Sequence, residues 1–174
     1  SDLLLGSVSV RNENAYQIVG PVYRQLGLAV SPDDCGLALR GLQTLAVRLA
    51  QLEKSTLEVA QWLTDNPHIA EVYHPAFPSC PGHEKWKRDF VGSASVFSFL
   101  FKDHCSSQQV KDFLNRLTIF KIGLSWGGVN SLAVIYPDIE RPGKDFGGRL
   151  VRLNIGLETP SDLIADLRAA LADL

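Results

Sequence analysis

The 174-residue sequence contains no methionine, no long apolar run and no excess of one charge. Its apolar stretches, such as Leu132 to Tyr136, fall far short of the ~20 residues that a membrane helix needs. Seventeen Lys plus Arg against 19 Asp plus Glu leave no long-range field to attract nucleic acid or an acidic membrane. The N-terminus also lacks the basic region and cleavage site of a signal peptide. We therefore expect a cytoplasmic protein with no nucleic-acid partner and no membrane.

Cysteine is scarce, and its spacing predicts neither a disulfide framework nor a metal finger. Cys35, Cys80 and Cys105 are odd in number and form no C-x-x-C pair, which is typical of reduced thiols in a cytosolic setting. The histidines also match no H-E-x-x-H or finger spacing. We expect no metal site and interpret the histidines as scattered surface and loop residues. They are His68, His74, His83 and His104.

The composition is that of one globular domain or of one large piece of a longer protein. Hydrophobic residues make up 45% and charged residues 21%. A chain of this length normally buries about 70% of its unfolded surface, so disorder is disfavoured. The chain begins with Ser1 instead of methionine, and we therefore expect it to have been cut, processed or subcloned out of something longer.

Capping residues and apolar periodicity predict one long helix in the first half of the chain. Ser31-Pro32-Asp33-Asp34 offers an N-cap, a proline at the first helical position and acids in the first turn. Apolar residues then recur at steps of three and four up to Asn66-Pro67, so we expect a single helix over 31–66. A core-spanning helix is favoured over a coiled coil, because Thr56 interrupts the apolar stripe and heptad-placed charges are few.

The rest of the sequence alternates between strand and helix patterns. Short apolar stretches predict strands over 3–10, 94–101, 132–136 and 150–155. Helical patterns cover 14–26, 106–117 and the segment from Thr159 to the end. This interleaving predicts an α/β fold with α+β character, in which helices cover one sheet.

The first candidate site is the tetrapeptide Ser125-Trp126-Gly127-Gly128. Two glycines permit positive φ and let the backbone approach a ligand, while the tryptophan offers an apolar wall and one N–H donor. The same four residues also suit an ordinary Gly-Gly bend with an anchoring tryptophan. Both interpretations stay open at this point.

The second candidate site is the strand over 150–156. With a two-residue period, one face is aliphatic and the other carries Arg152, Asn154 and Gly156. Burying an arginine is costly unless an anion meets it, and its planar fork suits a carboxylate. The spacing leaves two equal alternatives, which are a ligand carboxylate and a salt bridge to an internal Asp or Glu.

Five segments together resemble the pyridoxal-phosphate (PLP)-dependent enzymes of cysteine and methionine metabolism, in particular the bacterial carbon–sulfur β-lyases of that family. The segments are Ser1-Asp2, 40–45 (RGLQTL), 82–90 (GHEKWKRDF), 125–128 (SWGG) and 152–158 (RLNIGLE). They follow the family's order and cover essentially the whole chain. The resemblance implies a fold-type-I architecture of which this chain is the C-terminal portion.

The resemblance divides the chain into three parts. Residues 1–30 would be the tail of the large PLP-binding domain, 31–66 the long interdomain connector helix, and 67–174 the small C-terminal domain, a mostly antiparallel sheet covered by helices. The implied partners are the missing N-terminal large domain, further copies of the chain in a dimer or tetramer, and a small amino-acid substrate. Without the large domain, we expect apolar surface along 3–10 and the connector to favour self-association.

The resemblance also assigns roles to residues. The family's Schiff-base lysine lies just before the segment that matches Ser1-Asp2, so this chain would carry no catalytic and no cofactor-binding residue and would be inactive alone. Arg152 matches the arginine that clamps the substrate α-carboxylate. Ser125 and Trp126 match the substrate-pocket segment. No lysine present matches a cofactor position.

The activity implied for the intact parent is cleavage of L-cystathionine to homocysteine, pyruvate and ammonia in methionine biosynthesis. Trp126 favours the β-lyases, because γ-synthases and γ-lyases usually carry Ser-Leu-Gly-Gly preceded by Glu. Leu124 is neither that Glu nor the Tyr common in bacterial β-lyases, and Asn130 stands where Glu usually precedes Ser131. A γ-synthase or γ-lyase parent remains an alternative, and so does a non-catalytic module for carboxylate binding or assembly.

Overall fold

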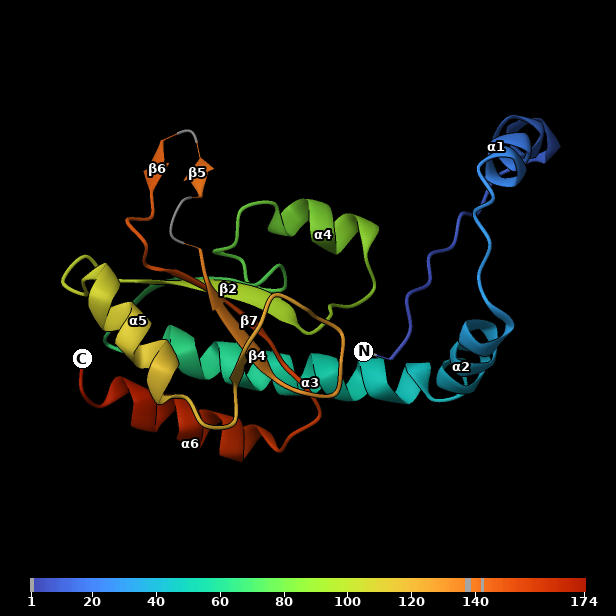
Figure 1. The fold of residues 1–174 in the computed structure, drawn as a ribbon. Coiled ribbons are helices and arrows are strands. Elements are labelled where there is room, and N and C mark those ends of the chain that lie inside the picture. Colours follow the sequence, from blue (N-terminus) through green and yellow to red (C-terminus); the bar gives the residue numbers. More distant parts are fainter. Residues whose placement is uncertain (1, 137–138, 142) are drawn as a thin grey trace. The chain divides into compact units, whose positions relative to one another are not determined.

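The computed structural model describes residues 2–136, 139–141 and 143–174, and it divides into two compact units (Figure 1). The first unit is Ser1–Ala46 and the second is Val47–Leu174. The second unit contains the sheet, the hydrophobic core and both candidate sites. No helix among the described residues combines the length and apolar character needed to cross a membrane.

Two helices form the regular structure of the first unit. They are α1 (Glu13–Gln25) and α2 (Pro32–Leu42). Each begins at the expected place, because Asn12 and Ser31 accept hydrogen bonds from the backbone N–H groups of Ala15 and Asp34. An apolar hollow lies beside α1 and is lined by residues such as Val8, which is 79% exposed. Self-association through this surface stays a prediction.

The strand expected over 3–10 is not present. Residues 2–10 form no regular element, and Leu4 is 93% exposed. A strand needs a neighbour to satisfy its backbone N–H and C=O groups, and no strand in the described part of the chain pairs with this segment. The apolar alternation alone therefore does not produce a strand here.

The single helix expected over 31–66 is interrupted. A second helix, α3 (Leu45–Thr64), begins after a two-residue break at Gln43 and Thr44. Gly41 is a weak helix former, and the Thr44 N–H bonds to its carbonyl three residues back at 3.3 Å instead of continuing the i−4 ladder. The helix ends where the Asn66-Pro67 stop predicted.

A five-stranded sheet lies at the centre of the second unit, and its order is β1-β2-β7-β4-β3 (Figure 1). The strands are β1 (Ile69–Tyr73), β2 (Val96–Phe101), β3 (Lys121–Ile122), β4 (Leu132–Ile135) and β7 (Leu150–Asn154). Every pair is antiparallel except β3 with β4. A separate hairpin pairs β5 (Glu140–Arg141) with β6 (Lys144–Asp145). The expectation of a mostly antiparallel sheet is confirmed.

Helices α3, α5 and α6 bury one face of this sheet. The last two span Ser107–Arg116 and Pro160–Leu171, and a short α4 (His83–Asp89) precedes β2. Phe99 and Leu153 point from the sheet into a core that also contains Leu63, Phe113 and Leu167 from the three helices. Because side chains alternate across a strand, the neighbours of Phe99 and Leu153 face away from this core. The second candidate site lies on that opposite face.

One carboxylate ties α6 to the segment that follows α5. Asp166, which is 7% exposed, accepts hydrogen bonds from the backbone N–H groups of Thr118, Ile119 and Phe120 and from the Thr118 hydroxyl. The distances are 2.7–3.2 Å. This segment leads directly into β3, so Asp166 fixes where the edge of the sheet begins.

Candidate functional site

The candidate site forms where β7 meets the loop between β3 and β4. Arg152 lies in the middle of β7, with Ser98 of β2 on one side and Val134 of β4 on the other. The register therefore places Arg152 at the centre of the sheet, on the face that the helices leave uncovered. Its half-buried side chain extends to the loop that contains Ser125 and Trp126.

Several neutral groups hold the guanidinium of Arg152. Its Nη1 donates to the Tyr136 hydroxyl at 2.7 Å, and its Nη2 donates to the carbonyls of Leu124 and Ser125 at 2.6 and 3.4 Å. The guanidinium carbon lies 5.6 Å from the ring centres of both Trp126 and Tyr136, within the range of cation–π attraction. The structure thus brings the three predicted site residues together.

The charge of Arg152 has no counter-ion within the described chain. No described Asp or Glu is its hydrogen-bond or ion-pair partner, so the internal salt bridge, one of the two alternatives, is absent from this part of the molecule. Its Nε is buried and has no hydrogen-bond partner among the described residues. Trp126 is 63% exposed, so the site opens to solvent on this side. A cation held by dipoles and rings beside an opening is suited to bind a carboxylate.

Asn154 lies two residues further along β7, and its side chain binds backbone groups of the loop. Its Oδ1 accepts from the Gly127 N–H and from the Ser95 hydroxyl, each at 2.9 Å, and its Nδ2 donates to the Asn130 carbonyl at 3.1 Å. Asn154 is 1% exposed. Gly127 adopts a φ of +74°, as its place in the tetrapeptide suggested. The Asn154 side chain on β7 therefore fixes the backbone conformation of this bend.

Gly156 continues this face and permits the loop to approach closely. A Cβ at this position would overlap the carbonyl oxygen of Val129 and would lie 2.6 Å from the carbonyl carbon of Asn130. Its N–H donates to the Ser131 hydroxyl, and Glu158 accepts from both the N–H and the hydroxyl of Ser131. Alternate residues from 152 to 158 thus all contact the loop over 124–131.

Two kinds of contact at this site were not expected from the sequence. Tyr136 was not a candidate, although the two-residue period of its predicted strand places it with Val134 on the face of Arg152. The carbonyls of Leu124 and Ser125 carry no sequence signal at all, because any residue offers one. Ser125 therefore reaches Arg152 through its backbone.

The residues at this site do not fit covalent attachment of pyridoxal phosphate. The described contacts of Arg152 are two rings, a hydroxyl and two carbonyls, with no lysine amine among them. Two of the chain's lysines bond elsewhere, since Lys121 donates to the Thr118 carbonyl and Lys144 pairs with Glu71. The site instead fits the carboxylate of a ligand.

The histidines fall into different environments. His74 is fully buried, accepts a hydrogen bond from the Ala76 N–H, and has its pKa lowered by burial, against the opposing charge of Glu53. His83 lies against the Pro75 carbonyl. His68 and His104, in contrast, are in contact with each other. The expectation of scattered histidines does not describe this pair.

Comparison with known proteins gives consistent matches. A family model described as "Cys/Met metabolism PLP-dependent enzyme" matches residues 1–172. The chain is 44% identical to a cystathionine beta-lyase of Bordetella avium over 98% of its length, and 41% identical to the cystathionine beta-lyase MetC of Escherichia coli K12 over 99%. It covers 44% and 45% of those proteins, so it spans about half the length of the curated relatives it matches.

A solved structure matches the fold as well. The crystal structure of a cystathionine gamma synthase from Xanthomonas oryzae pv. oryzae, in complex with aminoacrylate and cysteine, superimposes with a TM-score of 0.82. The sequences are 30% identical, and the match covers 93% of this chain and 43% of that one. The arrangement of helices and strands therefore has a close counterpart in a solved structure.

Proposed function

The chain belongs to the Cys/Met metabolism PLP-dependent enzymes, and from that premise we propose that it is the substrate-carboxylate-binding part of a carbon–sulfur β-lyase acting on L-cystathionine. The observation that carries the proposal is Arg152, a half-buried guanidinium with no described acidic partner and an unpaired Nε. The two cystathionine beta-lyase relatives, each more than 40% identical over nearly all of the chain, support the choice of substrate.

Arg152 in this proposal binds the α-carboxylate of the substrate. Tyr136 and the two loop carbonyls hold the plane of its guanidinium in advance, so little side-chain entropy is lost when the ligand binds. The ring of Trp126 lies beside the guanidinium at the open side of the site. Pyridoxal phosphate, bound by the rest of the intact enzyme, supplies the electron sink for the reaction. The 174-residue chain alone is then inactive.

A γ-type parent is the second candidate, because a cystathionine gamma synthase shares the fold with a TM-score of 0.82. Trp126, where γ-type enzymes usually have Leu, favours the β-lyase, whereas Leu124 matches neither type. A domain that binds a carboxylate without catalysis is the third. The three candidates differ in the products they would release.

The products released from L-cystathionine by the intact enzyme test the proposal. We expect pyruvate and homocysteine in equal amounts, measured by coupled reduction of the oxoacid and by thiol derivatisation. Release of 2-oxobutyrate with cysteine would instead identify a γ-lyase. If neither oxoacid appears, formation of cystathionine from an O-acylhomoserine and cysteine, with release of the carboxylic acid, would identify a γ-synthase. Absence of that reaction too, together with cystathionine binding to the 174-residue chain by calorimetry, would favour the non-catalytic module.

Replacing Arg152 by lysine tests the carboxylate assignment. Lysine keeps the positive charge but loses the planar pair of N–H donors. We therefore expect Arg152→Lys to lower kcat/KM for L-cystathionine by about 10- to 100-fold, which corresponds to the loss of about one charge-assisted hydrogen bond. The control is Arg168→Lys on α6, whose guanidinium stacks on Trp62 in contact with the core.

The matched substrate is a cystathionine analogue with an amide in place of the α-carboxylate of the cysteine half, the half that becomes pyruvate. If Arg152 binds the carboxylate, the variant loses much less activity with this analogue than with cystathionine, so the two changes are not additive. Equal losses with both substrates, or equal losses in Arg168→Lys, would refute the assignment.

A further inference from the structure

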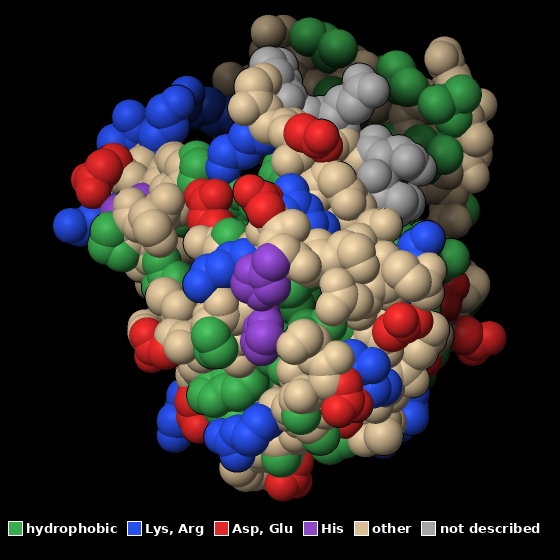
Figure 2. All heavy atoms as spheres, turned by 90° about the vertical axis from the view of Figure 1, so that its left-hand side faces the viewer, with side chains coloured by type: hydrophobic (Ala, Val, Ile, Leu, Met, Phe, Trp, Pro, Cys, Tyr) green, Lys and Arg blue, Asp and Glu red, His purple; other side chains and the backbone are tan. Residues whose placement is uncertain are grey.

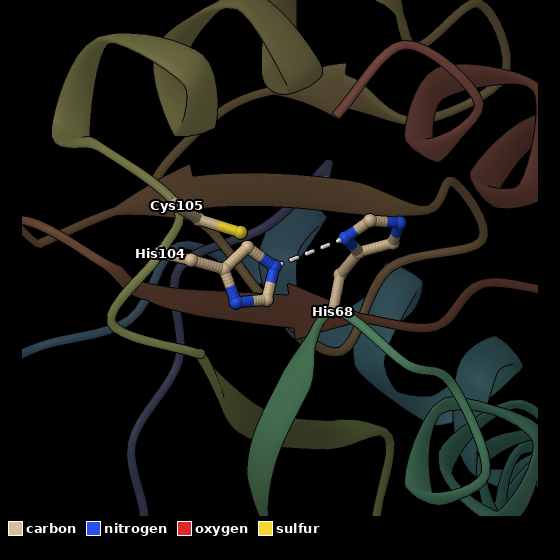
Figure 3. A group of neighbouring side chains, drawn as sticks. All are labelled: His68, His104 and Cys105. Atoms are coloured by element: carbon tan, nitrogen blue, oxygen red, sulfur yellow. Dashed lines mark hydrogen bonds between the residues drawn. The ribbon is translucent and has the colours of Figure 1, made fainter.

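Three potential metal-ligating side chains meet at the point where β1 begins and β2 ends (Figure 3). His68 immediately precedes β1, and His104 and Cys105 lie in the connection from β2 to α5. Backbone hydrogen bonds fix this junction, since the Lys102 N–H donates to the His68 carbonyl at 2.9 Å and the Cys105 N–H to the Lys102 carbonyl at 3.0 Å. The cluster contains none of the residues that contact Arg152.

The side chains of the cluster converge. Figure 3 shows Nδ1 of His68 facing Nε2 of His104, with the Cys105 sulfur beside the His104 ring. The two nitrogens are 3.4 Å apart, and the ligand atoms of all three residues lie within 4.8 Å of one another. The backbone pairing of β1 with β2 therefore brings together side chains 36 residues apart in sequence.

The 3.4 Å separation is long for a hydrogen bond and also fits two nitrogens that bind one metal ion. An N–H donor is normally about 2.9–3.0 Å from its acceptor. Two nitrogens that bind one tetrahedral zinc ion at about 2.0–2.1 Å lie about 3.3–3.4 Å apart. The corresponding sulfur–nitrogen distance at such an ion is about 3.5–3.6 Å, and all three ligand atoms lie within 4.8 Å of one another, so small side-chain rotations would complete the geometry.

Two imidazoles and one thiolate select for a particular class of metal. Magnesium and calcium prefer oxygen ligands, whereas zinc accepts nitrogen and sulfur in a tetrahedral arrangement. Cys105 is 1% exposed, His68 is half-buried and His104 is exposed. Figure 2 shows histidine side chains side by side at the molecular surface. An ion can therefore reach the cluster from solvent and bind above the buried sulfur.

We propose that His68, His104 and Cys105 form a zinc site, with a fourth position open to water, that joins the start of β1 to the connection between β2 and α5. The site is independent of the substrate site and of the proposed lyase activity. Because the ligands come together only in the folded chain, the ion binds the native state preferentially and stabilises it by mass action.

Metal titration of the complete 174-residue chain, with any purification tag removed, tests this proposal. We expect one zinc ion per chain in competition with a chromophoric chelator, together with a rise in Tm. Cobalt should give the intense d–d bands of a tetrahedral site and a thiolate-to-cobalt charge-transfer band. If the cobalt complex is octahedral or lacks the thiolate band, the proposal fails.

Two pairs of variants assign the ligands. His104→Ala changes an exposed side chain and should weaken zinc binding by about tenfold or more, whereas His83→Ala should leave the affinity unchanged. Cys105→Ser should abolish the charge-transfer band, and Cys80→Ser should keep it. If Cys105→Ser does not fold, the zinc affinity of His104→Ala and the cobalt spectrum of the parent chain still test whether these residues bind the metal. Unchanged affinity in His104→Ala would overturn the proposal.

Discussion

Replacing Asp166 by alanine should lower the free energy of unfolding by about 3–5 kcal/mol. The carboxylate accepts four hydrogen bonds from the Thr118–Phe120 segment, and alanine leaves three backbone N–H groups and one hydroxyl without that acceptor. Each unsatisfied buried donor costs about 1–3 kcal/mol. Because water can reach part of the segment, the total cost of the four donors is smaller than the sum of these values. Urea denaturation of the complete chain measures the change.

The control for this variant is Asp173→Ala, which removes an exposed carboxylate near the end of the chain. We expect its effect to stay within about 0.5 kcal/mol. Asp166→Asn should be intermediate, because an amide keeps one acceptor oxygen but turns its NH2 group toward some of the donors. If Asp166→Ala is as stable as Asp173→Ala, the carboxylate does not hold β3 to α6.

The same carboxylate gives stability a dependence on pH. Burial raises the pKa of Asp166, but hydrogen bonds from Thr118, Ile119 and Phe120 outweigh burial and lower it below its ordinary value near 3.8. Because the pKa is lower in the folded state, the stabilisation is complete above the unfolded value and is lost as pH falls through the folded one. The parent chain should therefore lose more stability below pH ~4 than Asp166→Ala does.

Replacing Gly156 by alanine should have the second large effect, on stability and on the substrate site together. The added Cβ meets the backbone at Val129 and Asn130, which cannot rotate away as a flexible side chain could. Overpacking of this kind costs about 1–3 kcal/mol and occasionally more, and we expect about 3 kcal/mol because Glu158 also binds this loop at Ser131.

Gly156→Ala should also disturb the site around Arg152, because the added Cβ displaces the loop that surrounds it. A shift of the segment over 124–131 moves the carbonyls and the ring that surround Arg152, and misplacement of about 1 Å can cost about 100-fold in rate. In the intact enzyme we expect kcat/KM for cystathionine to fall by about that factor. Gly36→Ala is the matched control, since a Cβ there meets nothing within 4 Å. Parent-like stability and activity in Gly156→Ala would contradict the close approach.

Local signals predicted most of the helices and the long strands. The cap at Ser31 and the prolines at helix starts act within a few residues, so they can be recognised in the sequence alone. Elements that depend on a distant partner were misjudged. The segment over 3–10 has a strand pattern but no neighbouring strand in the part of the chain that the structure describes. In contrast, β1 and β3 are short strands whose formation depends on pairing with β2 and β4.

The candidate site likewise has features that local sequence patterns predict and features that depend on tertiary structure. The two-residue period of β7 identified Arg152, Asn154 and Gly156 as one face, but whether a carboxylate of the chain neutralises Arg152 depends on tertiary structure. The zinc cluster could not be predicted, because it requires the antiparallel pairing of β1 with β2 and the sequence did not predict β1 as a strand. The roles proposed for Arg152, Ser125 and Trp126 stay predictions.

The strand face from Arg152 to Glu158 holds its loop largely through main-chain atoms, namely the carbonyls of residues 124, 125 and 130 and the N–H groups of residues 127 and 131. The side chains of Leu124, Trp126 and Val129 are each more than half exposed and make none of these hydrogen bonds, although the Trp126 ring contacts the guanidinium of Arg152. A substitution of Leu124 or Val129 would therefore change the exposed surface beside Arg152 while the main-chain contacts that fix the course of the loop stay in place.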